Sequence, residues 1–275
     1  MNPFEEQKKK QERINASMKS VNCLIAVGSG KGGVGKSTVS ANLALSLAKE
    51  GYRVGLADAD VYGPSIPTLF NIEKPEVMAI EKDGQEMMLP IEKFGIKLMS
   101  IGFMVDEKAP LMWRGPMASN ALTQMLSETL WGELDFLILD MPPGTGDIQL
   151  TLIQSFHPHG SIFVCTPQQL AVADVRRAIN MFDNENVKVP VFGLVENMSY
   201  FTPSDMPEKK YYIFGQDGGK RLAEELKIDF LGEIPISQNV SECNDNGNPV
   251  AMLFDSAEAK AFMELASRVA EKSKK

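Results

Sequence analysis

Short apolar runs alternate with helix-length segments through most of the chain. The runs predict strands at residues 23–27, 53–57, 96–101, 135–139, 161–165, 191–195 and 229–231. The segments between them predict helices at residues 36–50, 116–130, 148–154, 171–182 and 218–226, and a closing helix at about residues 257–271. Because this alternation is typical of βαβ units, we predict an α/β fold with a mostly parallel central sheet flanked by helices on both faces.

The two ends of the chain and one internal segment depart from this alternation. Residues 1–20 are polar and rich in Lys, Glu and Gln, so we expect a polar leader that forms a solvated or frayed helix. Residues 21–275 are expected to form a single domain. Residues 70–94 are charged and irregular, and they predict a small hairpin around Asp83 and Gly84.

Composition excludes several classes of partner. The formal net charge of −8 argues against nucleic acid or an anionic membrane as the main partner, since both require basic surfaces. No run approaches 18 apolar residues, so no membrane span is expected, and the polar leader has no apolar core. The 3 cysteines are far apart and form no C-x-x-C pair. This usage predicts a reducing, cytoplasmic location without a disulfide framework.

A glycine-rich loop carries the strongest chemical signal. It stands between a predicted strand and a predicted helix, and it reads as a phosphate-binding loop of the form G-x-x-x-x-G-K-S. The expected phosphate ligands are Gly30, Lys31, Gly32, Gly33, Val34, Gly35, Lys36, Ser37 and Thr38. Lys36 would reach the β- and γ-phosphates and Ser37 would offer a hydroxyl to Mg²⁺. Lys31 is a second cation that the ordinary loop lacks. The loop predicts a bound nucleoside triphosphate.

The same residues also spell a dinucleotide-binding fingerprint. Gly28, Gly30 and Gly33 have its spacing, and Asp58 ends the next predicted strand, as that motif requires. That interpretation leaves Lys36 without a role and predicts no second acidic strand end linked to the nucleotide. We therefore favour the triphosphate-binding loop.

Carboxylates follow two other predicted strands. Asp140 ends the apolar run 136–139 and fits the Walker B aspartate that holds Mg²⁺ through water, while Asp58 and Asp60 end the second strand. One of these two could hold a metal-bound water and the other could orient the attacking water. Carboxyl ends of parallel strands share one edge of a sheet, so these groups should meet the glycine-rich loop. A predicted switch loop follows at Pro142, Pro143, Gly144, Thr145, Gly146 and Asp147.

Five motifs identify a family resemblance. They are Gly30-Lys-Gly-Gly-Val-Gly-Lys-Ser-Thr38, Asp58-Ala-Asp-Val-Tyr-Gly-Pro-Ser-Ile-Pro67, Trp113-Arg-Gly-Pro-Met117, Leu139-Asp-Met-Pro-Pro-Gly-Thr-Gly-Asp-Ile-Gln149 and Glu196-Asn-Met198. With these motifs the chain resembles the Mrp/ApbC group of P-loop ATPases, within the wider class of MinD, ParA and nitrogenase iron protein. The resemblance runs from about residue 23 to the last helix.

The resemblance implies a role for each matching residue. Lys31 resembles the signature lysine that reaches the partner subunit's phosphates, which with Lys36 and Asp60 makes the expected catalytic set. Asp60 resembles the carboxylate that orients the attacking water. The implied Mg²⁺ ligands are Ser37, Asp58 and Asp140, and the implied adenine-binding residues are Asn197 and Pro235. Family members are homodimers that sandwich ATP and carry iron–sulfur clusters to apoproteins.

The chain departs from the family where the cluster would bind. Many members carry a C-x-x-C pair after the Glu-Asn-Met motif, and two subunits share a four-iron cluster through four thiolates. Residues 199–215 of this chain contain no cysteine and are expected to form an aromatic-anchored surface loop. No iron–sulfur ligand is therefore predicted by motif. Cys243, in a polar context, is the remaining candidate, because Cys23 and Cys165 lie in strands that look buried.

We therefore expect an ATP- and Mg²⁺-dependent ATPase that assembles or transfers iron–sulfur clusters. Its expected partners are a second copy of itself and apo iron–sulfur proteins or assembly factors. Two alternatives stay open at this point. One is a positioning or partition ATPase like MinD or ParA, and the other is a nucleotide-dependent regulator that carries no cluster.

Overall fold

The computed structural model describes residues 3–72, 75–82, 84–104, 115–185, 187–253 and 255–274. The strands within these residues are β1 (Val21–Ser29), β2 (Val54–Asp58), β3 (Ala79–Lys82), β4 (Gln85–Met88), β5 (Ile91–Lys93), β6 (Ile96–Ser100), β7 (Leu134–Asp140), β8 (Gly160–Cys165), β9 (Val191–Phe201) and β10 (Phe230–Ile236). The α-helices are α1 (Pro3–Met18), α2 (Lys36–Lys49), α3 (Ile66–Leu69), α4 (Gly115–Glu128), α5 (Asp147–Phe156), α6 (Gln169–Phe182), α7 (Gly218–Leu226), α8 (Gln238–Asp245) and α9 (Ala257–Lys272). Two short 3₁₀ turns, η1 (Ile101–Phe103) and η2 (Val250–Met252), complete the elements.

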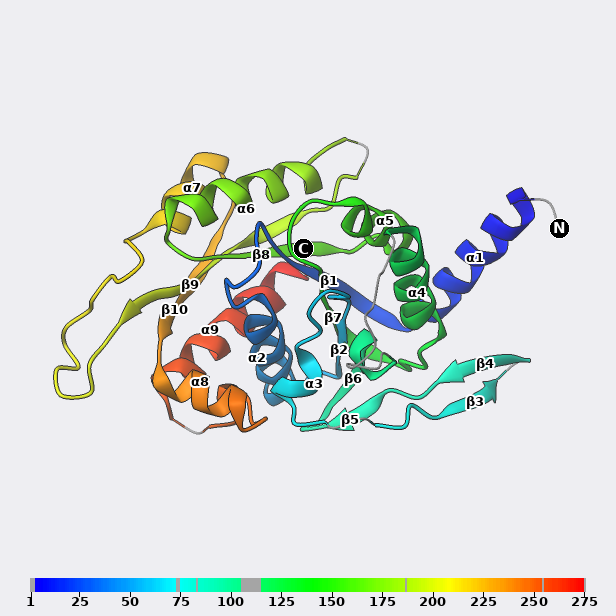
Figure 1. Cartoon of the computed structure of the whole chain (residues 1–275), viewed down its shortest axis with the longest axis horizontal. Helices are drawn as coiled ribbons and strands as arrows, with labels where there is room; N and C mark the ends of the chain where they lie inside the picture. Colours follow the sequence, from blue (N-terminus) through cyan, green and yellow to red (C-terminus); the bar gives the residue numbers. More distant parts are fainter. Residues whose placement is uncertain are drawn as a thin grey trace.

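The main sheet has its strands in the order β10-β9-β8-β1-β7-β2-β6-β5 (Figure 1). Each neighbouring pair is parallel except β5–β6, which is antiparallel. The predicted mostly parallel sheet is thus confirmed. Because β1 lies in the middle, between β8 and β7, the loop that follows it starts at the centre of the carboxyl edge.

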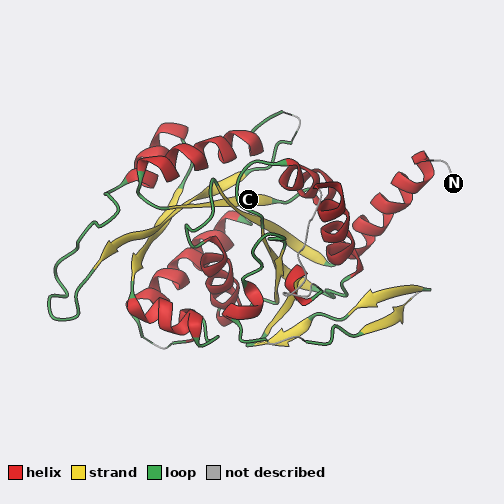
Figure 2. Cartoon of the chain, viewed as in Figure 1, coloured by secondary structure: helices red, strands yellow, loops and turns green. Residues whose placement is uncertain are grey.

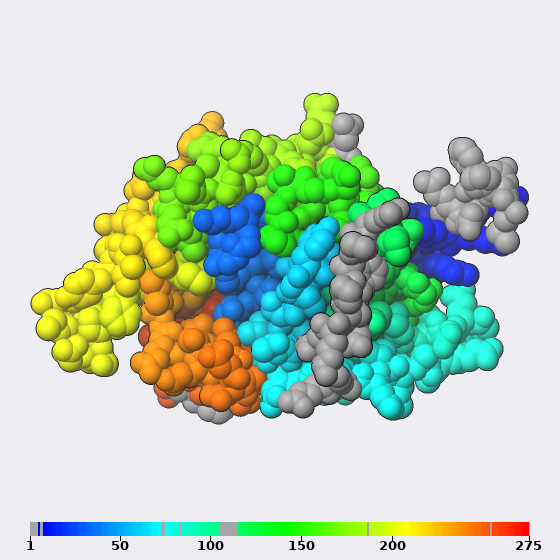
Figure 3. Space-filling model, in the orientation of Figure 1, coloured from blue at the N-terminus to red at the C-terminus, as the bar shows by residue number. Residues whose placement is uncertain are grey.

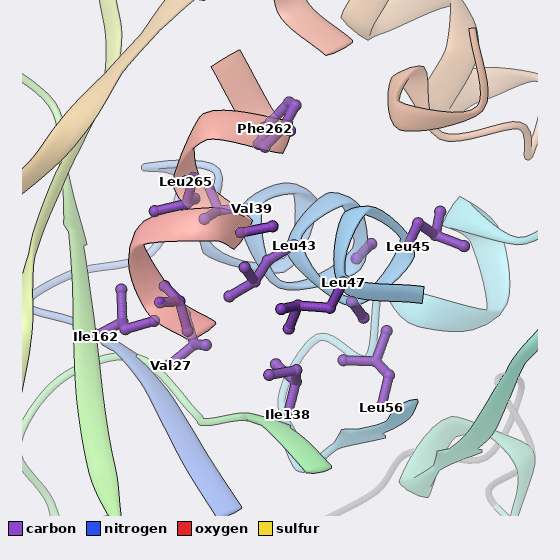
Figure 4. Close-up of a cluster of buried hydrophobic side chains, with 14 of the residues drawn as sticks. Val27, Val39, Leu43, Leu45, Leu47, Leu56, Ile138, Ile162, Phe262 and Leu265 are labelled. Atoms are coloured by element: carbon purple, nitrogen blue, oxygen red, sulfur yellow. The ribbon is translucent and has the colours of Figure 1, made fainter. Parts of the chain in front are cut away.

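Helices cover both faces of this sheet (Figure 2). The core on one face joins the strands to α2 and α9, where Leu43 and Phe262 are fully buried over Ile138 (Figure 4). The core on the other face joins Leu137 and Leu139 to α1 and α4–α7. Since both faces are buried, the central strands are continuous apolar runs rather than alternating ones. No described helix is long and apolar enough to cross a bilayer.

The N-terminal segment is a helix that rests on the domain. Ile14 of α1 is buried, and it belongs to the core that α4 and α5 cover. The Gln11 side chain donates to the carbonyl of Ser155 at 3.1 Å, and Lys10 Nζ donates to Asn120 Oδ1 at 3.0 Å. The expected helix is therefore present, and one face of it packs on the domain instead of being solvated all round.

A two-stranded hairpin projects beside the main sheet. Strands β3 and β4 pair antiparallel from Ala79–Met88 to Lys82–Gln85, at the predicted position (Figure 1). Asp83 of the predicted turn lies outside the described residues, and so do Trp113 and Arg114 of the family motif. The edge strand β5 and the helix α8 have no counterpart among the predicted elements.

Two strands extend beyond their predicted ends. Strand β9 continues to Phe201, and β10 continues to Ile236, with the two paired in parallel along this extension. The extension places Asn197 and Pro235 within neighbouring strands instead of in loops. It also carries the polypeptide beyond the body of the molecule at residues 199–215, seen as the yellow lobe in Figure 3.

Candidate nucleotide-binding site

The glycine-rich loop forms a shallow cradle between β1 and α2. Gly35, directly before α2, has φ 81°, a left-handed conformation that favours glycine. At Gly30 a Cβ would lie 2.1 Å from the backbone carbonyl carbon of Asp174 in α6, so only glycine fits there. A Cβ at Gly32 or Gly33 would meet nothing within 4 Å, which leaves this part of the loop open. The backbone amide groups at the start of a helix such as α2 favour a bound anion.

Lys36 brings the loop together with the acidic strand ends. Its Nζ donates to Asp140 Oδ2 at 2.8 Å and lies 3.7 Å from Asp60 Oδ2. The Ser37 hydroxyl donates to the same oxygen of Asp140 at 2.6 Å. Lys36 is 6% exposed and Asp140 is fully buried, so solvent screens this ion pair weakly. Four residues that the sequence assigns to phosphate or metal chemistry are therefore in contact.

Asp140 and Asp58 are neighbours across the sheet. They are paired in register at the ends of β7 and β2. The second oxygen of Asp140, Oδ1, accepts from Ser40 Oγ at 2.6 Å. Ser40 lies four residues after Lys36, one helical turn further along α2, so both side chains reach the same carboxylate. The sequence-based list of site residues missed Ser40, although this spacing would have indicated it.

Asp58 is a buried carboxylate fixed by three donors. One oxygen accepts from the backbone N–H of Asp60 at 3.1 Å, and the other accepts from Ser100 Oγ at 2.9 Å and from the backbone N–H of Ile66 at 3.1 Å. Burial and, after it, the charge of Asp140 raise the pKa of Asp58 to about 7, even though Lys36 opposes both effects. Ser100 ends β6 and was missed, although the strand-end rule that found Asp58 applies to it equally.

Asp60 lies at the rim of this cluster. Its Oδ1 accepts from the backbone N–H groups of Tyr62 and Gly63, both at 3.3 Å, and its other oxygen faces Lys36. Burial raises the pKa of Asp60, and the positive charge of Lys36 opposes that effect. A buried carboxylate with a fixed direction and a raised pKa is suited to orienting a water molecule.

The predicted switch loop is attached to the strand that precedes the glycine-rich loop. The Gly144 N–H donates to the Ser29 carbonyl at 2.9 Å. The Gln149 side chain donates to the carbonyls of Pro143 at 2.7 Å and Pro142 at 3.2 Å. The remaining residues of the loop are exposed: Thr145, Gly146 and Asp147. One half of the loop is thus fixed and the other half faces solvent.

The predicted adenine-binding residues border the same edge. Asn197 Nδ2 donates to the Val34 carbonyl in the glycine-rich loop at 2.8 Å. Asn197 is in register with Ile234, so Pro235 on β10 lies beside it. Met198 has φ 55°, a left-handed conformation that is uncommon for a methionine and marks a strained backbone position. Asn197 thus contacts the glycine-rich loop, and Pro235 follows its register partner on the neighbouring strand.

Lys31 is placed differently from Lys36. It is half-buried, and its backbone carbonyl accepts from Ser29 Oγ at 3.0 Å. In the part of the chain that the structure describes, its ammonium group takes part in no ion pair. The loop therefore presents one cation at its surface while the other is bound to carboxylates inside.

The cysteines do not assemble into a cluster site. Cys23 and Cys165 are buried, and Cys243 is half-buried in α8. Burial raises the pKa of Cys23 to about 11, and burial followed by the charges of Glu242 and Glu258 raises the pKa of Cys243. A raised pKa disfavours the thiolate that binds metal. Over the described ranges, no three or more His, Cys, Asp or Glu residues are grouped to hold a metal ion directly.

Residues 199–215 form an arm anchored by aromatic residues, as predicted. Phe201 and Tyr211 exchange backbone hydrogen bonds at 2.8 Å across the base of the arm. The rings of Tyr200 and Tyr212 are 6.4 Å apart, and Lys210 Nζ lies 3.7 Å from the centre of the Tyr200 ring. The large apolar side chains exposed on the arm are Phe201, Met206, Tyr211, Tyr212 and Ile213.

Known proteins match both the sequence and the fold. A family model described as the NUBPL iron-transfer P-loop NTPase (ParA) matches residues 20–270. An iron–sulfur cluster carrier protein of Aquifex aeolicus is 51% identical over 246 residues, which cover 88% of this chain and 66% of that protein. A nucleotide-binding protein of Archaeoglobus fulgidus in complex with ADP aligns with TM-score 0.76 and 40% identity, over 89% of this chain and 94% of that chain. The cell division ATPase MinD of Pyrococcus furiosus aligns with TM-score 0.65 and 18% identity, over 91% of this chain and 99% of that one, a likeness of fold alone.

Proposed function

Because the chain belongs to the iron–sulfur cluster carrier (Mrp/NUBPL) family of P-loop NTPases, we propose that it hydrolyses ATP and assembles or transfers iron–sulfur clusters to apoproteins. The observation that carries the ATPase part is the contact of Lys36 with Asp140 and Asp60 beside an open glycine-rich loop. Phosphoryl transfer requires positioning and charge neutralisation, and these groups supply both.

The donor atoms of the site fit a nucleotide with Mg²⁺. The loop amides and Lys36 would bind the phosphates, with Lys36 exchanging its contact to Asp140 for one to a phosphate oxygen. Ser37, Asp58 and Asp140 offer the oxygen ligands that Mg²⁺ prefers, in keeping with ligation that is partly through water. When bound, Mg²⁺ would neutralise charge on the β- and γ-phosphates. Asn197 and Pro235 would border the adenine.

Asp60 and Lys31 complete the proposed hydrolytic site. Asp60, at the rim of the carboxylate cluster, would accept a hydrogen bond from the attacking water and orient it. Lys31 has no ion pair within the described residues and lies at the surface of the loop, which supports a role towards the phosphates of a second subunit. We therefore propose a homodimer that encloses two nucleotides.

Three lysine variants test the ATPase. Lys36→Met should abolish ATP binding, whereas Lys31→Ala should retain ATP binding and lose hydrolysis. Lys220→Ala, an exposed lysine of α7, is the matched control and should behave as wild type. Nucleotide affinity is measured by calorimetry and turnover by phosphate release. Undiminished ATP affinity in Lys36→Met would contradict the proposed site.

The cluster part of the proposal rests on family membership and is tested separately. A four-iron cluster usually takes four thiolates. A homodimer would offer only two from Cys243, which is half-buried in each subunit. Anaerobic reconstitution with iron and sulfide should give cluster absorbance per dimer, and Cys243→Ser should remove it if this residue ligates. If wild type gains no absorbance, the chain carries no cluster on its own and acts as a nucleotide-dependent regulator.

The proposed place of action is the cytoplasm, where free thiols stay reduced. The proposed partners, beyond a second copy, are apo iron–sulfur proteins or assembly factors. Sedimentation with ATP in the presence of liposomes or DNA separates this proposal from a MinD- or ParA-like positioning role. ATP-dependent binding to either surface would favour the positioning role.

A further inference from the structure

A side chain far along the chain contacts the end of the glycine-rich loop. Asn244 in α8 donates from Nδ2 to Thr38 Oγ1 at 3.2 Å, across 206 positions of sequence. Thr38 is the last residue of the predicted phosphate-binding set. The carbonyl oxygen of the same amide, Asn244 Oδ1, is buried and has no hydrogen-bond partner in the described residues. Nothing in the sequence motifs assigns Asn244 a role.

The segment that carries Asn244 is fastened to α2. Asn42 donates from Nδ2 to the Thr38 carbonyl at 2.8 Å, and its Oδ1 accepts from the Ala251 N–H at 2.7 Å. Gly247, just after α8, has φ 65°, and a Cβ there would lie 2.1 Å from Asn71 Cβ. Residues 238–251 are thus held to α2 through the Ala251–Asn42 hydrogen bond and to the end of α3 through the packing of Gly247 on Asn71, and α8 lies near α2 and α3 in Figure 1. The Asn244 contact is therefore a fixed feature of the fold.

The direction of this hydrogen bond decides what Thr38 can do. A hydroxyl has one proton to donate and lone pairs to accept with. When Asn244 donates to Thr38 Oγ1, the proton of Thr38 stays available for a phosphate oxygen. If the amide turned its Oδ1 towards Thr38, that proton would be consumed. A phosphate that needs the proton selects the arrangement in which Asn244 donates.

We propose that Asn244 is a positioning residue, which sets the Thr38 hydroxyl as a hydrogen-bond donor to the bound nucleotide's phosphate. The inference rests on the proposed function, since it concerns the same nucleotide site. It adds a residue of α8 to a site otherwise built from β1, α2, β2, β6, β7, β9 and β10.

Two variants of Asn244 and a control test this role by calorimetric ATP affinity and by steady-state kinetics. Asn244→Ala should weaken ATP binding by about five- to tenfold, the effect of one hydrogen bond, and raise KM with kcat unchanged. Asn244→Asp has the same shape, so it should fold, but its carboxylate can only accept. The Thr38 hydroxyl would then donate its hydrogen bond to this carboxylate instead of to the phosphate, and the negative charge would repel the phosphate. ATP binding should therefore weaken more than in Asn244→Ala. Asn246→Ala, at the exposed end of the same helix, should match wild type.

A double-mutant cycle with Thr38→Val shows whether Asn244 acts through Thr38. In the Thr38→Val background, Asn244→Ala should produce no further loss of ATP affinity. Wild-type affinity in both Asn244 variants, or losses that add fully in the cycle, would overturn the inference. Failure of the wild-type chain to bind ATP would instead overturn the proposed function itself, and this role with it.

Discussion

Replacing Lys36 tests whether its ion pair stabilises the nucleotide-free fold as well as binding phosphate. Lys36 Nζ lies 2.8 Å from Asp140 Oδ2, with the lysine 6% and the aspartate 0% exposed. Lys36→Met preserves most of the side-chain volume and removes the charge, which leaves the Asp140 carboxylate buried without its cation. Removing one partner of a buried pair costs about 3–5 kcal/mol. At about 2 °C per kcal/mol for a chain of this size, the melting temperature should fall by roughly 6–10 °C.

The assay is urea unfolding of the nucleotide- and metal-free protein, followed by circular dichroism. The double variant Lys36→Met/Asp140→Asn removes the stranded charge together with its partner, and it should regain most of the lost free energy of unfolding. Asp140→Asn alone is the matched control. If Lys36→Met were as stable as wild type within about 1 kcal/mol, or if the double variant regained nothing, the ion pair would not stabilise the fold as argued.

Three further predictions test other parts of the fold. In the nucleotide-free protein, Gly30→Ala should lower the free energy of unfolding by about 1–3 kcal/mol, because the added Cβ would overlap the α6 backbone. Gly32→Ala, with open space around the added Cβ, should lower the free energy of unfolding by far less. Urea titrations of the two variants compare these effects. Burial raises the pKa of Glu196, which accepts from the Gly219 N–H, so its contribution to stability is present at low pH and lost as pH rises through the raised pKa. Glu196→Gln stays neutral, so its melting temperature relative to wild type should increase from pH 5 to pH 8, and a constant difference would contradict this. Phe262→Ala, fully buried between α9 and the sheet, should cost about 3–5 kcal/mol in urea unfolding while ATP affinity stays unchanged.

The parts of the site that the sequence predicts well are those that strand topology places. Asp58 and Asp140 are predicted at one edge because parallel strands end there, and they are paired in register. The predicted end of β9 falls too early because buried polar residues such as Glu196 and Ser199 interrupt the apolar pattern, and that of β10 because Gly232 and Glu233 interrupt it. Helix α8 was not predicted because it has no buried residue, and so no apolar periodicity marks it.

Contacts between segments that are distant in the sequence could not be predicted from it. The hydrogen bond between Asn244 and Thr38 depends on how residues 238–251 return to α2, and no local pattern encodes that path. The burial of one side of α1 likewise depends on a contact with distant segments. Among the α1 side chains whose burial is described, Ile14 is the buried apolar one in a helix of polar composition, and it packs in the core that α4 and α5 cover.

The distribution of charge explains why the carboxyl edge of the sheet holds the site. At the opposite edge, Arg53 and Glu133 form an ion pair with side chains 51% and 79% exposed, which solvent screens and which contributes little. At the carboxyl edge, Asp58 and Asp140 are fully buried, and burial of charge destabilises a fold unless partners compensate it. Here Lys36, several hydroxyls and backbone N–H groups provide that compensation. In the proposed function, an anionic phosphate chain would bind Lys36 while its metal ion would bind the carboxylates, and the two together would compensate all of these buried charges.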